Sequence, residues 1–136
     1  MSEHKNIDDA LRILVQLGLP RAQHNQRSAL CLLALLDLKP GRKWKQAGIP
    51  LLGITPIMDW AKRHYESDYA PNTRETFRRQ TMHQFVAAGI ALNNPDKPDR
   101  PTNSPDTVYQ VAPEALTLLK TYGSRSWAGN LADWLA

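Results

Sequence analysis

Apolar positions recur at helical spacing in several segments of the chain, and prolines or glycines separate these segments. Asn6 predicts the start of the first helix, because asparagine is a favoured N-cap, and Gly18 with Pro20 predicts its end. The expected apolar face of this helix consists of Ile7, Leu11, Leu14 and Val15. A second helix is expected over residues 25–38, and its centre is apolar on nearly every side. This pattern predicts that the second helix forms the middle of the core.

The next helix is predicted by a threonine and a proline in sequence. Thr55 can accept a hydrogen bond from a free N–H at a helix start, and Pro56 fits the first helical position because no bond is lost there. We therefore expect a third helix over residues 56–66. The segment before it, residues 42–54, is interpreted as a connector.

A fourth helix is predicted over residues 73–88, directly after a short break. Pro71 disfavours helical geometry in the residue before it, so the third helix cannot continue through this point. Asn72 and Glu75 have the spacing of a capping box, which indicates a new helix start. The two helices would then form a helix-turn-helix.

The remainder of the chain predicts a hairpin and two more helical segments. Two short strands, GIALN and TVYQV, are expected in residues 90–111, a segment that we name the wing. Between them, residues 94–106 contain four prolines in 13 residues, which excludes a helix or a central strand. Residues 113–123 predict an amphipathic helix, and residues 126–136 a helical tail.

This order of elements predicts a mainly α fold: a winged helix-turn-helix with a small two-stranded β-hairpin wing. The chain has 136 residues, of which 42% are hydrophobic, so it can bury one ordinary core but not two. We expect residues 1–136 to form a single domain, with residues 73–88 as its recognition helix.

The distribution of charge along the chain indicates which class of ligand this fold could bind. The net charge is +4, and the basic excess falls in residues 42–83, which hold eight basic and four acidic residues. A localised basic surface attracts polyanions, chiefly nucleic acid, although one solvated helix face gives the same composition. The single cysteine, Cys31, lies in an apolar run and can form neither a disulfide framework nor a zinc site.

The chain has no sequence that indicates a membrane or an export signal. Its first residues are polar and acidic, and its longest apolar run is far shorter than the ~20 residues of a membrane span. We therefore expect a cytoplasmic protein without a membrane partner.

On a helical wheel, the predicted recognition helix has one apolar and one polar side. The expected buried side comprises Phe77, Thr81, Phe85 and Ala88, flanked by Met82 and Val86. The expected outer side comprises Thr76, Arg79, Gln80 and His83. Arginine can bond two acceptors of guanine and glutamine can bond adenine, so this side is predicted to contact bases in the major groove of double-stranded DNA.

Four further basic residues are predicted to contact DNA phosphates, which would position the helix without selecting a sequence. They are Arg74 and Arg78 on the helix, which alternatively pair with Glu75, and Lys97 and Arg100 on the wing. His83 has no Cys, Asp or Glu at ligand spacing, so a groove contact is preferred over a metal or general base. We predict no catalytic and no metal-binding residue.

Several stretches together resemble a known family: LLALLDLKPG, PLLGITPIMDW, YAPNTRETFRRQTMHQFV, NNPDKPDRPTNSP and YQVAPEALTLL. They are similar to the amino-terminal domain of BsuBI/PstI-type type II restriction endonucleases. The resemblance implies a helix-turn-helix or winged-helix DNA-binding domain joined to a carboxy-terminal PD-(D/E)xK nuclease domain. It further implies magnesium as the nuclease cofactor and CTGCAG as the recognised sequence.

This chain departs from the family pattern where the nuclease domain would begin, because no acidic cluster with a suitable lysine follows. The two acidic-x-Lys triplets, Glu3 to Lys5 and Asp37 to Lys39, fall at the amino terminus and at a helix end, and are interpreted as coincidence. We therefore expect this chain alone to bind DNA without cutting it. It would need no cofactor, while Mg²⁺ would serve the absent nuclease domain.

Two other functions remain open at this point. A stand-alone winged-helix regulator, for example of a restriction-modification operon, would use the same helix as a homodimer on a palindrome. A protein-interaction module on the same scaffold would not depend on the arginines. Trp127 and Trp134 in the tail would dock on the nuclease domain in the first case and form a two-fold interface in the second.

Overall fold

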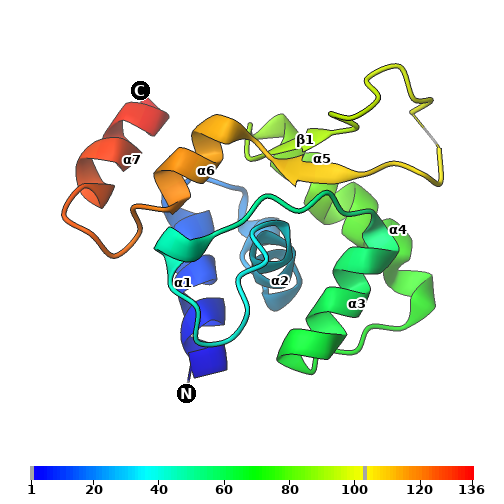
Figure 1. The fold of residues 1–136 in the computed structure, drawn as a ribbon, viewed down its shortest axis with the longest axis horizontal. Helices are drawn as coiled ribbons and strands as arrows, with labels where there is room; N and C mark the ends of the chain where they lie inside the picture. Colours follow the sequence, from blue (N-terminus) through cyan, green and yellow to red (C-terminus); the bar gives the residue numbers. More distant parts are fainter. Residues whose placement is uncertain (1, 103) are drawn as a thin grey trace.

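The computed structural model describes residues 2–102 and 104–136, and it confirms a mainly helical chain with a two-stranded sheet (Figure 1). The α-helices are α1 (Ser2–Gln16), α2 (Gln26–Leu35), α3 (Ile54–Tyr65), α4 (Arg74–Thr76), α5 (His83–Ala87), α6 (Pro113–Leu119) and α7 (Trp127–Leu135). Tighter turns are the 3-10 helices η1 (Arg21–Gln23), η2 (Trp44–Gln46) and η3 (Pro71–Thr73). The remaining elements are the π-helix η4 (Phe77–Met82) and the strands β1 (Ala91–Asn93) and β2 (Tyr109–Val111).

Helix α2 is the centre of the core, as its sequence predicts. Every residue from 28 to 35 is buried, and α1 and α3 lie on either side of it (Figure 1). Asn25 caps this helix, because its side-chain oxygen accepts a hydrogen bond of 2.9 Å from the N–H of Ser28. The cap therefore satisfies a backbone donor at the buried start of the helix.

Helix α1 begins at Ser2, so the predicted start at Asn6 is wrong. Asn6 is buried within the helix, and its Nδ2 donates to the backbone oxygen of Lys39 and to the hydroxyl of Tyr65, both at 3.1 Å. The Tyr65 hydroxyl donates in turn to the backbone oxygen of Leu38 at 2.8 Å. Asn6 therefore connects α1 with the end of α3 and with the turn after α2, through partners that are distant in sequence.

The buried face of α1 differs from the expected one. Val15 is 54% exposed, whereas Ala10 and Ile13 are fully buried beside Leu14. Asp9 is also buried, and its carboxylate accepts a hydrogen bond of 3.3 Å from the indole N–H of Trp44. Polar residues with tertiary partners thus occupy positions that the apolar pattern assigned to the surface.

Helix α3 begins one residue before Thr55, which makes no side-chain cap. The N-cap is Gly53, and Pro56 occupies the third helical position. The preceding residue, Leu52, forms an antiparallel bridge with Tyr109, with backbone bonds of 2.8 and 3.0 Å. The segment interpreted as a connector therefore enters the sheet, and this pairing places the start of α3.

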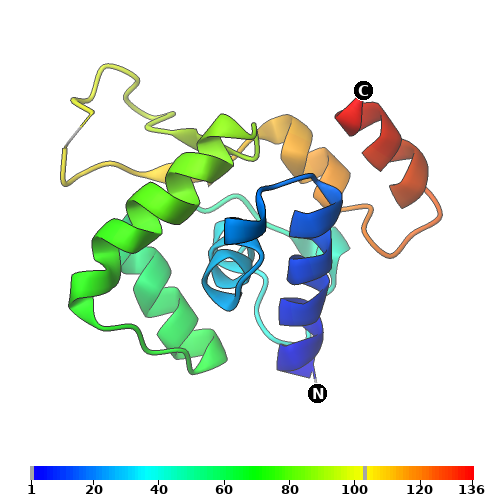
Figure 2. The ribbon, with the colours of Figure 1, turned by 180° about the vertical axis from the view of Figure 1, so that it is seen from behind.

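The predicted recognition helix is present as one helical segment, formed by α4, η4 and α5, that lies beside α2 (Figure 2). From here on, recognition helix means residues 74–87. Its expected capping box does not form, because the N-cap is Thr73 without a side-chain bond. Its end is as predicted: Gly89 has φ 79° and Ile90 N–H donates to the oxygen of Phe85 at 2.9 Å, which is a Schellman motif.

The middle of the recognition helix is a π-helix, which the wheel with α-helical spacing did not predict. Phe77 and Met82, five positions apart, are both fully buried, so Met82 belongs to the core rather than to its flank. Thr81 is also buried, and its hydroxyl accepts a hydrogen bond of 2.9 Å from Arg27 Nε on α2. Ala88, which was expected on the buried side, is exposed.

The wing is a hairpin in which β1 pairs antiparallel with β2, with Leu92 opposite Gln110. The strands are shorter than GIALN and TVYQV, and the described part of the intervening loop is neither helix nor strand, as expected. Asn94 turns the chain out of β1 in a left-handed conformation with φ 51°. Its side-chain oxygen accepts from Val108 N–H at 3.1 Å, which fixes the base of the loop.

The tail forms helix α7 and packs against this domain itself. Trp127 is buried, with its ring 5.0 Å from that of Tyr122 and its N–H bonded to Gln16 at 3.0 Å. Trp134 is half-buried and lies beside Gly89. The expectation that Trp127 docks on another domain or on a second copy is therefore wrong, because its ring is already covered.

Cys31 lies in the interior, as expected. In the described part of the chain, no helix is both long and apolar enough to cross a membrane. Cys31 is fully buried, and this burial raises the pKa of its thiol far above the usual range.

We predict that Asn6→Ala lowers the free energy of unfolding by about 1–3 kcal/mol, because it leaves buried hydrogen-bonding groups without partners. Urea unfolding followed by circular dichroism measures this change. Asn72→Ala, at an exposed asparagine, is the control and should unfold at nearly the wild-type urea concentration. Equal stability of the two variants would contradict the role of Asn6.

We predict that Cys31 does not react with a thiol reagent in the folded protein at pH 8. Its raised pKa means that the reactive thiolate is scarce at this pH, and burial excludes the reagent. A colorimetric disulfide reagent measures the rate with and without urea. Rapid reaction without urea would show that the centre of α2 opens readily.

Candidate nucleic-acid interface

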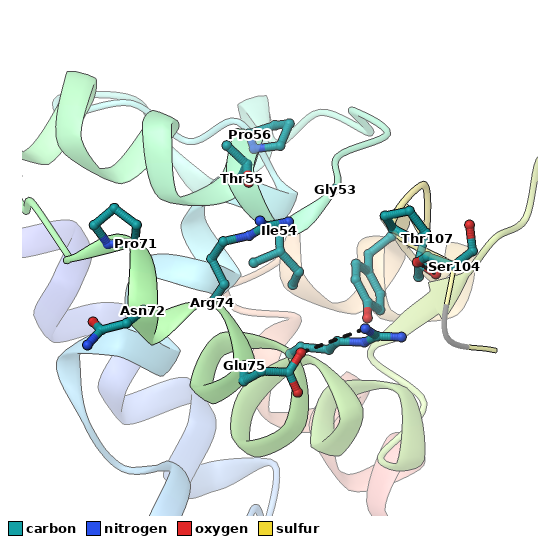
Figure 3. A pocket seen from close by; sticks show the side chains of 13 residues that line it. Gly53, Ile54, Thr55, Pro56, Pro71, Asn72, Arg74, Glu75, Ser104 and Thr107 are labelled. Atoms are coloured by element: carbon teal, nitrogen blue, oxygen red, sulfur yellow. Dashed lines mark hydrogen bonds and ion pairs between the residues drawn. The ribbon is translucent and has the colours of Figure 1, made fainter.

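A groove of about 740 Å³ separates the recognition helix from the wing. Its lining combines helix residues with residues of the hairpin: Glu75, Arg78, Arg79, His83, Val86, Asn93, Thr102, Thr107 and Tyr109. A neighbouring pocket of about 430 Å³ continues towards the start of α3 and shares Glu75, Arg78, Thr107 and Tyr109 with the groove (Figure 3). The polar face of the helix therefore forms one wall of a continuous depression that the wing closes on the other side.

Arg78 joins the recognition helix to the wing. Its Nη2 donates to the backbone oxygen of Thr102 at 2.8 Å, and its Nη1 lies 3.8 Å from Glu75 Oε1. The Tyr109 hydroxyl also lies within its reach: burial raises the pKa of Tyr109, and the Arg78 guanidinium partly opposes that shift. With 28% of its side chain exposed, Arg78 holds both walls of the groove in place.

Arg79 has a different environment, since 81% of its side chain is exposed. Its Nε lies 2.9 Å from Glu75 Oε2, in an i,i+4 ion pair. Gln80 and His83 are exposed on the same helix. These three side chains are the predicted base contacts that the structure leaves open to a ligand.

The other predicted helix contacts are placed at the start of the helix. Arg74 is exposed and extends towards Ile54 at the start of α3 (Figure 3), and it lines the smaller pocket. Thr76 is half-buried and Gln80 is exposed, and neither side chain lines a pocket. The structure therefore brings Arg74, Arg78, Arg79 and His83 along one depression.

The two basic residues of the wing are in contrasting situations. Lys97 is exposed, and its backbone N–H donates to the oxygen of Asn94. Arg100 forms two bonds of 3.1 Å to the carboxylate of Asp96 and one of 2.8 Å to Asn94 Oδ1. The Arg100 guanidinium lowers the pKa of Asp96 through these bonds. Arg100 therefore holds the loop together, and its contact with phosphate stays a prediction.

Sequence reasoning did not find the wing side of the groove. Thr102, Thr107 and Tyr109 line it because the hairpin folds back over the recognition helix, and nothing in the local pattern marks them. Asn94 was also missed, although an asparagine that follows a strand and precedes a proline is typical of a turn.

The described residues hold no group of three or more His, Cys, Asp or Glu side chains that could bind a metal ion. Asp37, from one acidic-x-Lys triplet, accepts a hydrogen bond of 2.8 Å from Trp60 Nε1. Lys5, from the other triplet, pairs with Asp9 at 3.1 Å. Both residues thus have structural partners.

The sequence model of one protein family, described as the BsuBI/PstI restriction endonuclease HTH domain, matches residues 4–136 of this chain. This chain belongs to that family. The membership agrees with the geometry, in which α3 and the recognition helix form the helix-turn-helix and the hairpin lies beside it (Figures 1 and 2).

Individual members of the family support this assignment. The type II restriction enzyme BsuBI of Bacillus subtilis is 54% identical over 133 residues, which are 98% of this chain and 42% of that enzyme. The type II restriction enzyme AplI of Arthrospira platensis is 38% identical, over 94% of this chain and 39% of its own. The solved structure of the SdaI restriction endonuclease matches with a TM-score of 0.90 and 40% identity, over 95% of this chain and 40% of that chain.

This chain spans 42% or less of the length of each of these relatives. Their names describe whole restriction enzymes. What the similarity establishes for this chain is therefore the helix-turn-helix domain of the family.

We predict that Arg78→Ala loosens the wing, because it removes the bond to the oxygen of Thr102. Losing about 1 kcal/mol of local stability corresponds to about fivefold faster amide exchange in residues 94–108. Hydrogen-exchange mass spectrometry measures this rate. Arg74→Ala removes the same charge from the same helix and should leave the wing unchanged; equal acceleration in both variants would argue against the tie through Arg78.

Proposed function

We propose that this domain binds double-stranded DNA in a sequence-specific manner, as the HTH domain of a type II restriction endonuclease of the BsuBI/PstI kind. The observation that carries the proposal is the pair of faces on the recognition helix. Phe77, Met82 and Phe85 are fully buried, while Arg79 and His83 on the opposite side line an open groove. Such a helix can enter a DNA groove without losing its own packing.

The exposed side chains fit the chemistry of base edges in the major groove, which is about 12 Å wide. Arg79 carries two terminal amino groups that match the O6 and N7 acceptors of guanine. Gln80 carries one donor and one acceptor, which match adenine. Both bases occur in CTGCAG, the sequence that the family resemblance implies.

The remaining basic residues suit the sugar-phosphate backbone. Arg74 extends from the start of the helix, and Lys97 is exposed on the wing. Arg78 and Arg100 are held by protein partners, so they would offer phosphate only their remaining donors. Contacts of this kind give affinity and orientation rather than sequence preference.

The proposal extends to the enzyme in which such a domain operates. A PD-(D/E)xK nuclease domain in the same enzyme would cut the DNA and would hold the Mg²⁺ that this chemistry uses. A homodimer would place two copies of the helix on the two halves of a palindrome. We place this activity in the cytoplasm, where the DNA is found.

We predict that Arg79→Ala and Gln80→Ala each lose roughly 1–3 kcal/mol of discrimination at particular base pairs, because each removes a two-point contact with a base. Lys97→Ala should weaken binding to every sequence alike and reduce its dependence on salt. Fluorescence anisotropy with CTGCAG and its single-substitution duplexes, at several salt concentrations, measures both effects.

The control is Lys45→Ala, at an exposed lysine of η2 that lines neither part of the groove. It should retain wild-type discrimination and nearly wild-type affinity. If the Arg79, Gln80 and Lys97 variants all lost the same affinity on every duplex, the assignment of Arg79 and Gln80 to bases and of Lys97 to phosphates would be refuted. Absence of duplex binding by the wild-type chain would refute the proposed function itself and favour a protein-interaction module.

A further inference from the structure

We propose that Glu75 is a positioning residue that fixes Arg79 for guanine recognition and couples this arginine to the wing. The inference rests on the proposed function, because it concerns how the recognition helix selects its DNA. Glu75 lies in the first turn of the helix, with 61% of its side chain exposed, and it lines both parts of the groove.

The ion pair with Arg79 uses only one edge of the guanidinium group. Glu75 Oε2 lies 2.9 Å from Nε, and the structure shows no hydrogen bond from the terminal amino groups of Arg79 to any described residue. Those two groups are the donors that bond O6 and N7 of guanine. The carboxylate thus holds the arginine by its inner edge and leaves the edge that recognises guanine available.

Fixing this side chain matters because it is so exposed. An arginine with 81% of its side chain in solvent samples many rotamers and loses that freedom when it binds a base. The ion pair with Glu75 restricts these rotamers before DNA arrives. The restriction favours one position of the guanidinium relative to the helix, and therefore one base pair over its neighbours.

The second carboxylate oxygen faces the arginine that is tied to the wing. Glu75 Oε1 lies 3.8 Å from Arg78 Nη1, the contact drawn as a dashed line from Glu75 in Figure 3. Arg78 Nη2 donates to the backbone oxygen of Thr102. One carboxylate therefore lies between a fixed arginine and an exposed one. Arg78 limits the positions that Glu75 can adopt, and Glu75 limits those of Arg79.

The negative charge of Glu75 acts in opposite directions on the affinity for DNA in general and on the selection of one sequence. A carboxylate in a groove that receives DNA repels phosphates, so it lowers the affinity for every sequence. Its presence between two DNA-facing arginines therefore cannot serve general affinity. A role in orienting Arg79 accounts for an acidic residue at this position.

The test compares two variants that remove the same charge. Glu75→Ala removes the acceptor, whereas Glu75→Gln retains a neutral acceptor of the same length. The probes are a CTGCAG duplex, a duplex with 7-deazaguanine in place of each guanine in turn, and an unrelated duplex. The 7-deaza base lacks N7, so it reports directly on the two-point contact of an arginine with guanine.

We expect wild type to lose affinity for the 7-deazaguanine duplex at one guanine. Glu75→Ala should reduce this discrimination by about two- to fivefold, the factor that corresponds to one exposed ion pair. Glu75→Gln should lose less, since the amide oxygen at the same place still attracts the guanidinium, although more weakly than a carboxylate does. Both variants should bind the unrelated duplex equally, and more tightly than wild type, whereas a damaged fold would bind every duplex less tightly.

Two controls test whether the effect passes through Arg79. In an Arg79→Ala background, Glu75→Ala should leave the discrimination unchanged. Glu114→Gln, at an exposed glutamate of α6 outside both parts of the groove, should behave as wild type on all duplexes.

The outcomes separate this inference from the proposed function. If wild type discriminates among the duplexes and Glu75→Ala does so equally well, the inference is wrong while the proposed function stands. An undiminished effect of Glu75→Ala in the Arg79→Ala background would also overturn it. If wild type does not discriminate at all, the proposed function fails, and the inference with it.

Discussion

The packing of the recognition helix on α2 is the constraint on which the DNA-facing surface depends. Phe77, Met82 and Phe85 are fully buried on the inner side of this helix, and Thr81 bonds to Arg27 of α2. Residues 28–35 of helix α2 are all buried, so the recognition helix packs on a well-protected part of the fold. The outward direction of its polar side chains is thereby fixed from within.

Polar contacts then connect this helix with the rest of the domain. Arg78 bonds to the wing loop, and Asn94 and Arg100 hold that loop at its base. Leu52 pairs with Tyr109, so the sheet also determines where α3 begins. The two helices of the helix-turn-helix and the wing are therefore placed relative to one another by side-chain and backbone bonds between distant segments, and the groove between them follows from that placement.

The π-helix shows how tertiary packing changes a local pattern. An α-helical wheel assigns Met82 to the flank and Ala88 to the buried side, whereas the structure buries Met82 and exposes Ala88. A π-helical segment brings residues five positions apart onto one line, which lets Phe77 and Met82 enter the core together. The outer residues Arg79, Gln80 and His83 were nevertheless predicted to be exposed, and they are.

The sequence by itself determined the order of the helices, the buried centre of α2, the end of the recognition helix at Gly89 and the hairpin around the proline-containing loop. These features follow from apolar periodicity, from the left-handed conformation of glycine and from the missing N–H of proline, which all act over a few residues. Only the tertiary structure decided that Asn6 is buried, that Trp127 packs within this domain, and that Arg78 bonds to Thr102 of the wing. Each of these depends on a partner brought close by folding, and such a partner leaves no mark on the local pattern of residues.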